Sequence, residues 1–299
     1  MSWSCTTTRI IVRDKMHLRR MTRSDHPSCA SLGARAYLDD EIFAYLAPHR
    51  HEHPRDFRNY MLRRLKMRYT QQGMHGFVCV SDNLDGRTRH DEASESSVPQ
   101  EEIVMGYSFW KRIGTANDRI AAKWQRHNSS PIARLEEMLL AVEDRYAQIF
   151  RLDRSHSPAR VATYRNAVVN ARPFARLPAH WHLQTLAVSP DYQRRGVGRC
   201  LLEWGLEMAR EEGVSVTVES SDVGRQLYAK NGFKVVDWLG LGVEEGWLSG
   251  AAMICDVERR WTREVVEGEV AVKGGREVEV TWTERLQSED QEQRGEPSI

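Results

Sequence analysis

The chain has 299 residues, 40% of them hydrophobic, which is enough apolar mass for one decorated domain or two small ones. Its 43 basic and 42 acidic residues give a net charge of +1, which argues against a general attraction to nucleic acid or to an anionic membrane surface. No stretch has the apolar core of a signal peptide or the length of a membrane span. We therefore expect neither nucleic acid nor a membrane among its partners.

The five cysteines are scattered, odd in number and without close pairs: Cys5, Cys29, Cys79, Cys200 and Cys255. Such spacing is typical of free thiols in a reducing compartment, and it lacks the pattern of metal ligands. We expect a cytoplasmic protein without a metal site, and the nucleus stays open as its location.

Two segments near the start have the pattern of a first strand, residues 9–13 and residues 16–20. A helix capped by Thr22 or Ser24 follows, and another helix begins near Pro54. Strands are predicted over residues 76–81 and 103–110. Between these strands, residues 82–102 have almost no apolar content, so they are predicted to be a flexible loop.

Residues 117–152 are predicted to form a helical insertion, with a helix that starts at Pro131. Its apolar side chains recur at helical spacing: Leu135, Met138, Leu139, Val142, Tyr146 and Ile149. A closing strand is predicted over residues 251–257. Residues 261–299 form a polar extension, in which residues 267–282 are expected to pair as a weak hairpin and Ser288 onward to be disordered.

The most informative segment is Gln193-Arg194-Arg195-Gly196-Val197-Gly198, which lies between an apolar strand at 182–188 and an amphipathic helix that Gly213 ends. Glycine lets a backbone approach a ligand closely, and the free N–H groups of a helix start bind anions. Arg199 adds positive charge to the same turn. The segment therefore predicts a site for a phosphate-bearing ligand.

Two common phosphate loops do not fit this segment. A Walker loop needs Gly-Lys followed by Ser or Thr, which is missing. A dinucleotide fingerprint needs a third glycine, and Arg199-Cys200-Leu201 follows Gly198 instead. What remains is a Gln/Arg-x-x-Gly-x-Gly/Ala pattern after a Leu-x-Val strand.

A second motif follows about thirty residues later, after a strand over residues 214–218 and a short helix from Ser221. It reads Tyr228-Ala229-Lys230-Asn231-Gly232-Phe233. Together the two motifs resemble the GNAT superfamily of acyl-CoA-dependent N-acyltransferases. The resemblance implies an α/β fold of the α+β type, with a mixed, mostly antiparallel sheet flanked by helices, over residues 9–260. A minimal family member lacks the 117–152 insertion, and because it precedes the cofactor strand we expect it to wall one side of the acceptor pocket.

In that family the glycine loop cradles the pyrophosphate of coenzyme A, and the preceding strand pairs with the pantetheine arm. The resemblance therefore implies acetyl-CoA as co-substrate, held by Leu186, Ala187, Val188, Gln193, Arg194, Arg195, Gly196, Val197, Gly198 and Arg199. Ser221 stands where the family often has an asparagine that bonds the pantetheine arm. Asp222 is expected to cap the helix that begins there. The tryptophans Trp110 and Trp204 are expected in the core rather than in the acceptor pocket.

For catalysis the resemblance implies Tyr228 as the acid that protonates the leaving thiolate, with packing under the cofactor as the alternative. The cofactor strand offers no carboxylate as a base. On that strand His182 is the candidate general base, because the reference pKa of a histidine suits proton transfer near neutral pH. Glu219 and Asp222 are alternatives, although Glu219 is expected to end its strand in solvent. An acceptor amine that arrives neutral needs no base.

We thus predict an acetyl-CoA-dependent N-acetyltransferase that acts on a small-molecule amine through a ternary complex, as a monomer or homodimer. Two other functions stay open. One is acetylation of a protein amine. The other is acyl-CoA binding without catalysis, which the missing strand carboxylate favours and Tyr228 disfavours.

Overall fold

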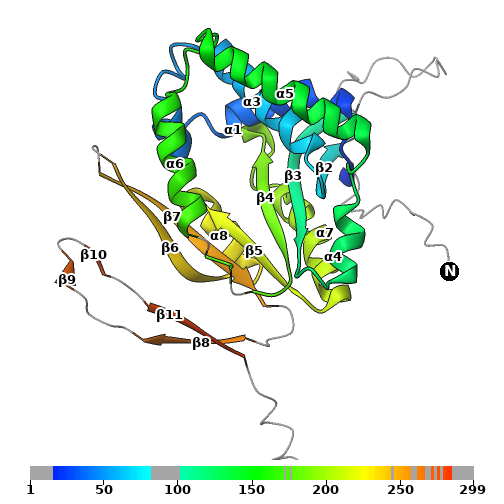
Figure 1. The fold of residues 1–299 in the computed structure, drawn as a ribbon, viewed down its shortest axis with the longest axis vertical. Helices are drawn as coiled ribbons and strands as arrows, with labels where there is room; N and C mark the ends of the chain where they lie inside the picture. The colour runs from blue at the N-terminus through cyan, green and yellow to red at the C-terminus, as the bar shows by residue number, and fades with distance from the viewer. Residues whose placement is uncertain are drawn as a thin grey trace, which may run out of the picture.

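The computed structural model describes residues 16–81, 102–171, 173–175, 177–243, 246–256, 261–266, 271–272, 275–276 and 279–284. A seven-stranded sheet lies at its centre (Figure 1). Its strands are β1 (Met16–Arg20), β2 (Met74–Ser81), β3 (Ile103–Ile113), β4 (His180–Val188), β5 (Ser215–Ser220), β6 (Lys234–Val243) and β7 (Gly246–Cys255). Their order is β1-β2-β3-β4-β5-β7-β6, and β4 with β5 is the parallel pair while the other neighbours are antiparallel. The predicted mixed, mostly antiparallel sheet is confirmed.

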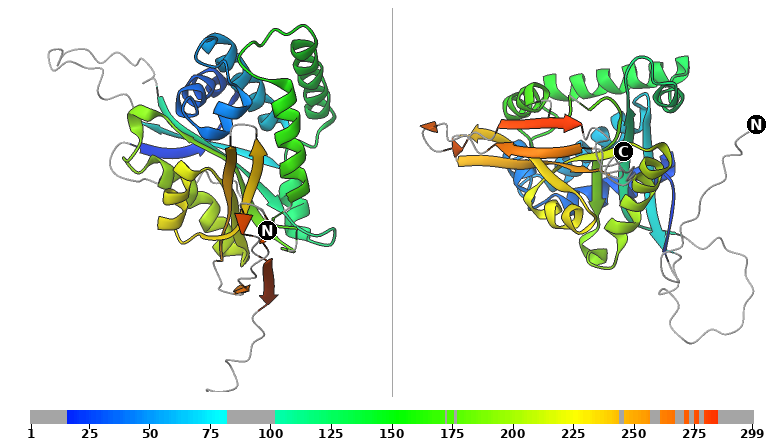
Figure 2. Two further views of the ribbon diagram at one scale, coloured as in Figure 1. Left: turned by 90° about the vertical axis from the view of Figure 1, so that its left-hand side faces the viewer. Right: turned by 90° about the horizontal axis from the view of Figure 1, so that it is seen from below.

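Eight described helices surround this sheet: α1 (His26–Ala36), α2 (Glu41–Leu46), α3 (Pro54–Thr70), α4 (Arg119–Gln125), α5 (Pro131–Ile149), α6 (Pro158–Ala171), α7 (Val197–Glu212) and α8 (Asp222–Lys230). Figure 2 shows the blue helices α1 and α3 on one side of the sheet and the yellow-green α7 on the other. Alternation along β2 explains the two layers. Phe77 and Cys79 pack with the α7 side, whereas Val78 and Val80 pack with the α1 and α3 side.

Tryptophans fill the core under α7, as expected for Trp110 and Trp204. Trp110 and Trp181 are fully buried, and the rings of Trp181 and Trp204 lie 5.2 Å apart in an edge contact. Gly205 of α7 lies against the ring of Trp110. The helix can approach the sheet so closely because this position carries no side chain.

The first strand of the sheet is β1, which is one of the two predicted alternatives. The other, residues 9–13, lies outside the described residues. After β1, Thr22 forms a capping box with Asp25 at a short 3-10 turn (Arg23–Asp25), and α1 begins at His26. The carboxylate of Asp25 also accepts a bond from Arg19 at 2.8 Å, so the start of α1 is tied to β1.

The predicted insertion contains α4 and α5, and α5 begins at Pro131 as predicted, with Ser130 as its cap. Its apolar face nevertheless does not point into the core. The side chains of Leu135, Met138, Leu139, Val142, Tyr146 and Ile149 are between 54% and 65% exposed. The helix rests on α3 through its other side, where Asp144 lies 3.6 Å from Arg63. Helices α2 and α6 were not predicted.

The end of the chain also differs from the prediction. Strand β7 begins at Gly246, five residues before the expected start. Within the expected hairpin over 267–282, β9 (Ala271–Val272) pairs antiparallel with β10 (Gly275–Arg276), and a longer antiparallel pair of β8 (Trp261–Val266) and β11 (Glu279–Glu284) begins before this range and ends beyond it. Figure 1 shows these strands outside the seven-stranded sheet. The predicted loop residues 82–101 and the tail from Ser288 lie outside the described residues.

Among the helices that the structure describes, none is long and apolar enough to cross a bilayer. Within the same part of the chain, no three His, Cys, Asp or Glu side chains are grouped as metal ligands would be.

Replacing Gly205 with alanine should destabilise the fold, because the new methyl group would overlap the buried ring of Trp110. We expect the free energy of unfolding to fall by about 2 kcal/mol, measured by urea unfolding, even though alanine is the better helix former. Glu211→Ala is the control, since this position is exposed on the same helix. Equal stability of the two variants would contradict the close packing of α7 on Trp110.

Candidate active site

Strands β4 and β5 run together for only four residues and then separate. His180–Leu183 pair with Ser215–Val218. Beyond this point, β4 continues beside β3, whereas Glu219 and Ser220 of β5 pair with β7. The register of β4 against β3 also shifts by one residue, which leaves Gln184 as an extra, bulged position. The second half of β4 thus has an edge that no strand covers, in the middle of the sheet.

A cavity of about 470 Å³ opens where these strands separate. It is lined by β4 and β5, by α8, and by residues from the α1–α2 region, α3 and α6. No residue of α4 or α5 lines it, so the prediction that the 117–152 insertion walls this pocket is wrong. The reason is that α5 packs on the outer side of α3, while the unpredicted α6 supplies Tyr164 and Ala167 to the wall.

The glycine motif forms the turn between β4 and α7. Gly196 precedes the helix with φ of +93°, and Arg194 has φ of +61°. The first helical bond runs from the N–H of Cys200 to the carbonyl of Gly196, at 3.0 Å. The N–H groups of Val197, Gly198 and Arg199 therefore precede the helical ladder and are free to bind an anion.

Gly198 keeps this turn close to α8. A Cβ atom at this position would lie 3.0 Å from Leu227, whereas one at Gly196 would meet only Met16, at 3.7 Å. Gly196 is therefore required by its backbone angle, and Gly198 by the space around it.

The side chains of the motif are mostly exposed to solvent. Gln193 donates to the carbonyl of Val188 at 3.4 Å and closes the turn onto β4. The guanidinium of Arg195 lies 5.5 Å from the ring of Tyr192, and Arg199 lies 3.7 Å from Glu203. Among the described residues no carboxylate pairs with Arg194 or Arg195, so both charges are available to an anion at this turn.

The open edge of β4 comprises Leu186, Ala187 and Val188, the residues that the sequence resemblance assigns to the pantetheine arm. Leu186 lines the cavity and Ala187 is buried. The carbonyl of Leu186 accepts a hydrogen bond from the hydroxyl of Tyr37, at 2.9 Å. Tyr37, at the end of α1, was not predicted at the site.

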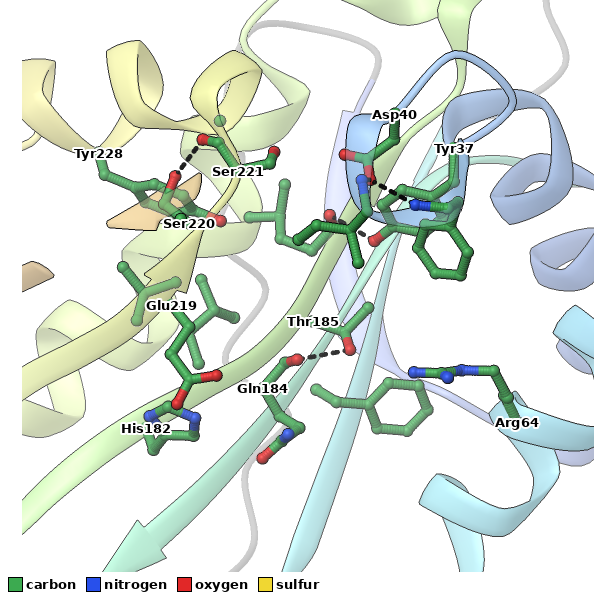
Figure 3. A pocket seen from close by; sticks show the side chains of 18 of the residues that line it. Tyr37, Asp40, Arg64, His182, Gln184, Thr185, Glu219, Ser220, Ser221 and Tyr228 are labelled. Atoms are coloured by element: carbon green, nitrogen blue, oxygen red, sulfur yellow. Dashed lines mark hydrogen bonds between the residues drawn. The ribbon is translucent and has the colours of Figure 1, made fainter. Parts of the chain in front are cut away.

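Tyr228 lies on α8 and lines the cavity (Figure 3). It is buried, and its ring lies 5.6 Å from that of Phe233. Burial raises the pKa of its phenol well above the ordinary value, and nearby Tyr37 raises it further. The hydroxyl therefore carries its proton throughout the physiological range and can donate it.

His182, on β4, also lines the cavity. It is buried, and its Nδ1 atom lies 2.9 Å from the hydroxyl of Thr217. Burial lowers its pKa to about 4, and the positive charges of Arg68 and Lys111 act in the same direction. Its imidazole is therefore neutral near pH 7.

Glu219 corrects an expectation. It does not end its strand in solvent but is half-buried and lines the cavity. Burial raises the pKa of its carboxyl group, and the charge of Arg68 opposes that rise. The strand continues past Glu219 because its backbone pairs with Ala252 of β7, which holds the side chain inside (Figure 3).

At the start of α8, Ser221 is the cap residue and Asp222 the first helical residue, so the expected capping role of Asp222 is wrong. Asp222 pairs with Arg225 at 3.2 Å instead. Ser221 lines the cavity, opposite Asp40 of the α1–α2 region. Burial raises the pKa of Asp40, and hydrogen bonds from Phe43, Ile42 and Ser221 oppose the rise.

Sequence reasoning missed the residues that line the cavity from the far side of β4. They are Tyr37, Asp40, Arg64, Arg68 and Tyr164. A partial signal exists for two of them. Arg64 and Arg68 are four residues apart in the helix predicted to begin near Pro54, so they share one side of that helix.

The fold and the site define an α+β protein with a phosphate-type helix start beside an open strand edge and a cavity. Residues 156–235 match the family model described as the acetyltransferase (GNAT) domain. This range contains the glycine motif and the Tyr228–Phe233 motif. This segment of the chain is thus similar to a GNAT acetyltransferase domain.

A relative named "Acetyltransferase" from Stachybotrys chartarum is 26% identical over 219 residues, which cover 73% of this chain and 80% of the relative. Two solved structures are also similar. A protein from Corynebacterium glutamicum, described as histone acetyltransferase HPA2 and related acetyltransferase, has 17% identity and a TM-score of 0.46, with 81% of this chain and 96% of that chain covered. A mosquito arylalkylamine N-acetyltransferase like 5b has 17% identity and a TM-score of 0.40, with 80% and 98% covered.

The burial of His182 predicts a loss of stability in acid. Above about pH 6.5 the imidazole is neutral in both the folded and the unfolded chain. As the pH falls from 6.5 towards 4, the unfolded chain takes up a proton that the folded chain does not, so folding becomes less favourable. When the pH falls from 7 to 5, the free energy of unfolding should decrease in both proteins. The decrease should be about 1–2 kcal/mol smaller for His182→Asn than for the parent protein.

The measurement is urea unfolding at pH 5, 7 and 9. Between pH 7 and 9 the difference between the two proteins should stay constant, which is the internal control. The same loss of stability at pH 5 in both proteins would show that His182 is charged in the folded state.

Proposed function

We propose that the protein is an acetyl-CoA-dependent N-acetyltransferase that transfers an acetyl group to the amine of a small molecule within a ternary complex. One observation carries the proposal. The uncovered edge of β4 leads from the turn at Gly196 into a cavity that contains both a buried phenol and a half-buried carboxylate. Such an arrangement suits a long donor with a phosphate end and a reactive end.

In this proposal the pyrophosphate of coenzyme A binds to the N–H groups at the start of α7. Arg194, Arg195 and Arg199 surround it with positive charge, and the turn from Gln193 to Gly198 shapes the site. The pantetheine arm lies along Leu186–Val188 and takes the place of the missing neighbour strand, with Ser221 on the other side. The thioester then lies between β4 and Tyr228.

The reaction needs two proton movements. The amine nitrogen attacks the thioester carbonyl, the C–S bond breaks, the nitrogen loses a proton and the sulfur gains one. Tyr228 is suited to give the proton to the sulfur because its phenol stays protonated. Glu219 and His182 line the cavity and can accept the proton from the amine. Glu219 has the advantage that its pKa is raised from the ordinary value towards neutrality.

The location of Glu219 bears on the alternative function, which is acyl-CoA binding without catalysis. That alternative rested on the absence of a carboxylate from β4. A carboxylate is present in the cavity, but it comes from β5. The walls supplied by α2, α3 and α6 favour a small acceptor over a protein chain.

Replacing Gly198 with valine should abolish binding of coenzyme A, because the side chain would meet Leu227 and obstruct the N–H groups of the turn. We expect the dissociation constant, measured by calorimetry, to rise at least about 100-fold. Glu211→Ala, exposed at the far end of the same helix, should bind normally. Unchanged affinity in a folded Gly198→Val protein would exclude this turn as the cofactor site.

Replacing Tyr228 with phenylalanine should keep the packing against Phe233 and remove the proton donor. We expect kcat to fall by about 100-fold or more while the affinity for coenzyme A stays the same. The measurement is thiol release from acetyl-CoA with a panel of amines, for both proteins. Thiol release by the parent protein tests the proposed function itself, and binding without turnover would leave the non-catalytic alternative. Full activity of Tyr228→Phe across the pH range would exclude the acid role.

A further inference from the structure

The acceptor side of the cavity contains two arginines that lack acidic partners. Arg64 and Arg68 of α3 both line the cavity and are half-buried. Among the described residues, no carboxylate oxygen lies within 4 Å of either guanidinium. Arg64 donates to the hydroxyl of Tyr60 at 2.9 Å, and its guanidinium lies 5.7 Å from the ring of Phe43. These contacts leave most of its N–H groups without an acceptor.

Other arginines inside this fold are paired. Arg63, on the same helix, binds Asp153 at 2.7 Å. Arg112 binds Glu212 at 2.6 Å, and Arg19 binds Asp25 at 2.8 Å. A buried cation is costly without an anion, so the protein normally supplies one. Arg50, which is also buried and has no carboxylate partner among the described residues, donates instead to the carbonyls of Leu38 and Ala47, whereas Arg64 and Arg68 line the cavity.

The surroundings make the charge of Arg68 unfavourable, whereas the contacts of Arg64 with Tyr60 raise the pKa of Arg64. Burial lowers the pKa of Arg68 to about 10, and the neighbouring charge of Arg64 lowers it too. Three acidic side chains also line the cavity, namely Asp40, Glu219 and Asp237. Asp40 caps α2 through Ile42, and Asp237 accepts the N–H of Trp238, so both are engaged locally.

The walls near the arginines combine the tyrosines Tyr107 and Tyr164 with apolar side chains. The apolar side chains include Phe43, Leu46, Met61, Leu65 and Phe109. A guanidinium forms two parallel hydrogen bonds with a carboxylate, and an apolar environment strengthens them. Glu219 lies at the other side of the cavity from Arg64 (Figure 3), where it suits a cationic or reacting amine.

We propose that the acceptor is an amino acid-like molecule, which carries a carboxylate for Arg64 and Arg68 in addition to its amine and has an apolar side chain. The proposal rests on the proposed function, because it identifies the substrate class of the same site. Arg68 is a specificity-determining residue here, and a purely cationic amine is a poor acceptor.

Three matched compounds test this. L-Phenylalanine has the amine and the carboxylate, phenethylamine has only the amine, and 3-phenylpropionate has only the carboxylate. Acetyl transfer should be about 10- to 100-fold more efficient, as kcat/KM, with phenylalanine than with phenethylamine. Arg68→Met should reduce this ratio to about one, and Arg68→Lys should retain part of it. The KM for acetyl-CoA should stay the same. Arg55→Met, exposed on the same helix, is the control.

Binding of 3-phenylpropionate to the protein saturated with coenzyme A separates the two proposals, because it needs no turnover. We expect Arg68→Met to weaken it about 10-fold or more. Absence of acetyl transfer with Arg68-dependent binding would contradict the enzyme and support the carboxylate site. Equal efficiency with phenylalanine and phenethylamine, or binding of 3-phenylpropionate that does not depend on Arg68, would overturn the inference. If Arg68→Met does not fold, Arg68→Gln replaces it in both measurements.

Discussion

The separation of β4 and β5 after four paired residues is the constraint on which the rest of the site depends. Each strand keeps its backbone bonds by pairing on its outer side, β4 with β3 and β5 with β7. The inner edges are left open, although open backbone groups inside a sheet are normally costly. The hydroxyl of Tyr37 satisfies one of them, the carbonyl of Leu186. The cavity exists because no strand lies between these two edges.

The same separation links the two ends of the donor site. The turn after β4 begins α7, and the chain after β5 begins α8, so each strand leads into one of these helices. Gly198 lets the start of α7 contact Leu227 of α8 closely. Tyr228 is the next residue along α8. The position of the phenol is therefore fixed relative to the helix start by a packed contact and does not depend on a flexible loop.

The strand, turn and helix of the proposed donor site could be predicted from the sequence because their signals are local. An apolar strand, a glycine turn and a helix that Gly213 ends follow one another within about thirty residues, and each has a recognisable pattern. Glu219 was placed wrongly because a charged residue at a strand end usually faces solvent, and only the pairing with β7 carries it inward. The apolar side chains of α5 are the opposite case, because their spacing is typical of a buried face and yet they are exposed. Their helical spacing was correct, but periodicity does not show whether a face is covered.

The acceptor side depends on contacts between distant parts of the chain. Tyr37, Arg68, Tyr164 and Glu219 come from four different elements, and no spacing in the sequence relates them. Burial acts on four titratable groups in this cavity in the direction of their neutral forms. It raises the pKa of Glu219 and Asp40 and lowers the pKa of Arg68 and His182.

A ligand group of opposite charge therefore contributes more here than it would in water, because it replaces lost solvation as well as adding attraction. The phosphate turn, by contrast, is exposed, and its charges are screened by solvent and salt. Under the proposed function, discrimination between acceptors is thus decided mainly by the few buried charges on α3 and β5. Recognition of the proposed donor is distributed over the backbone of β4 and the start of α7.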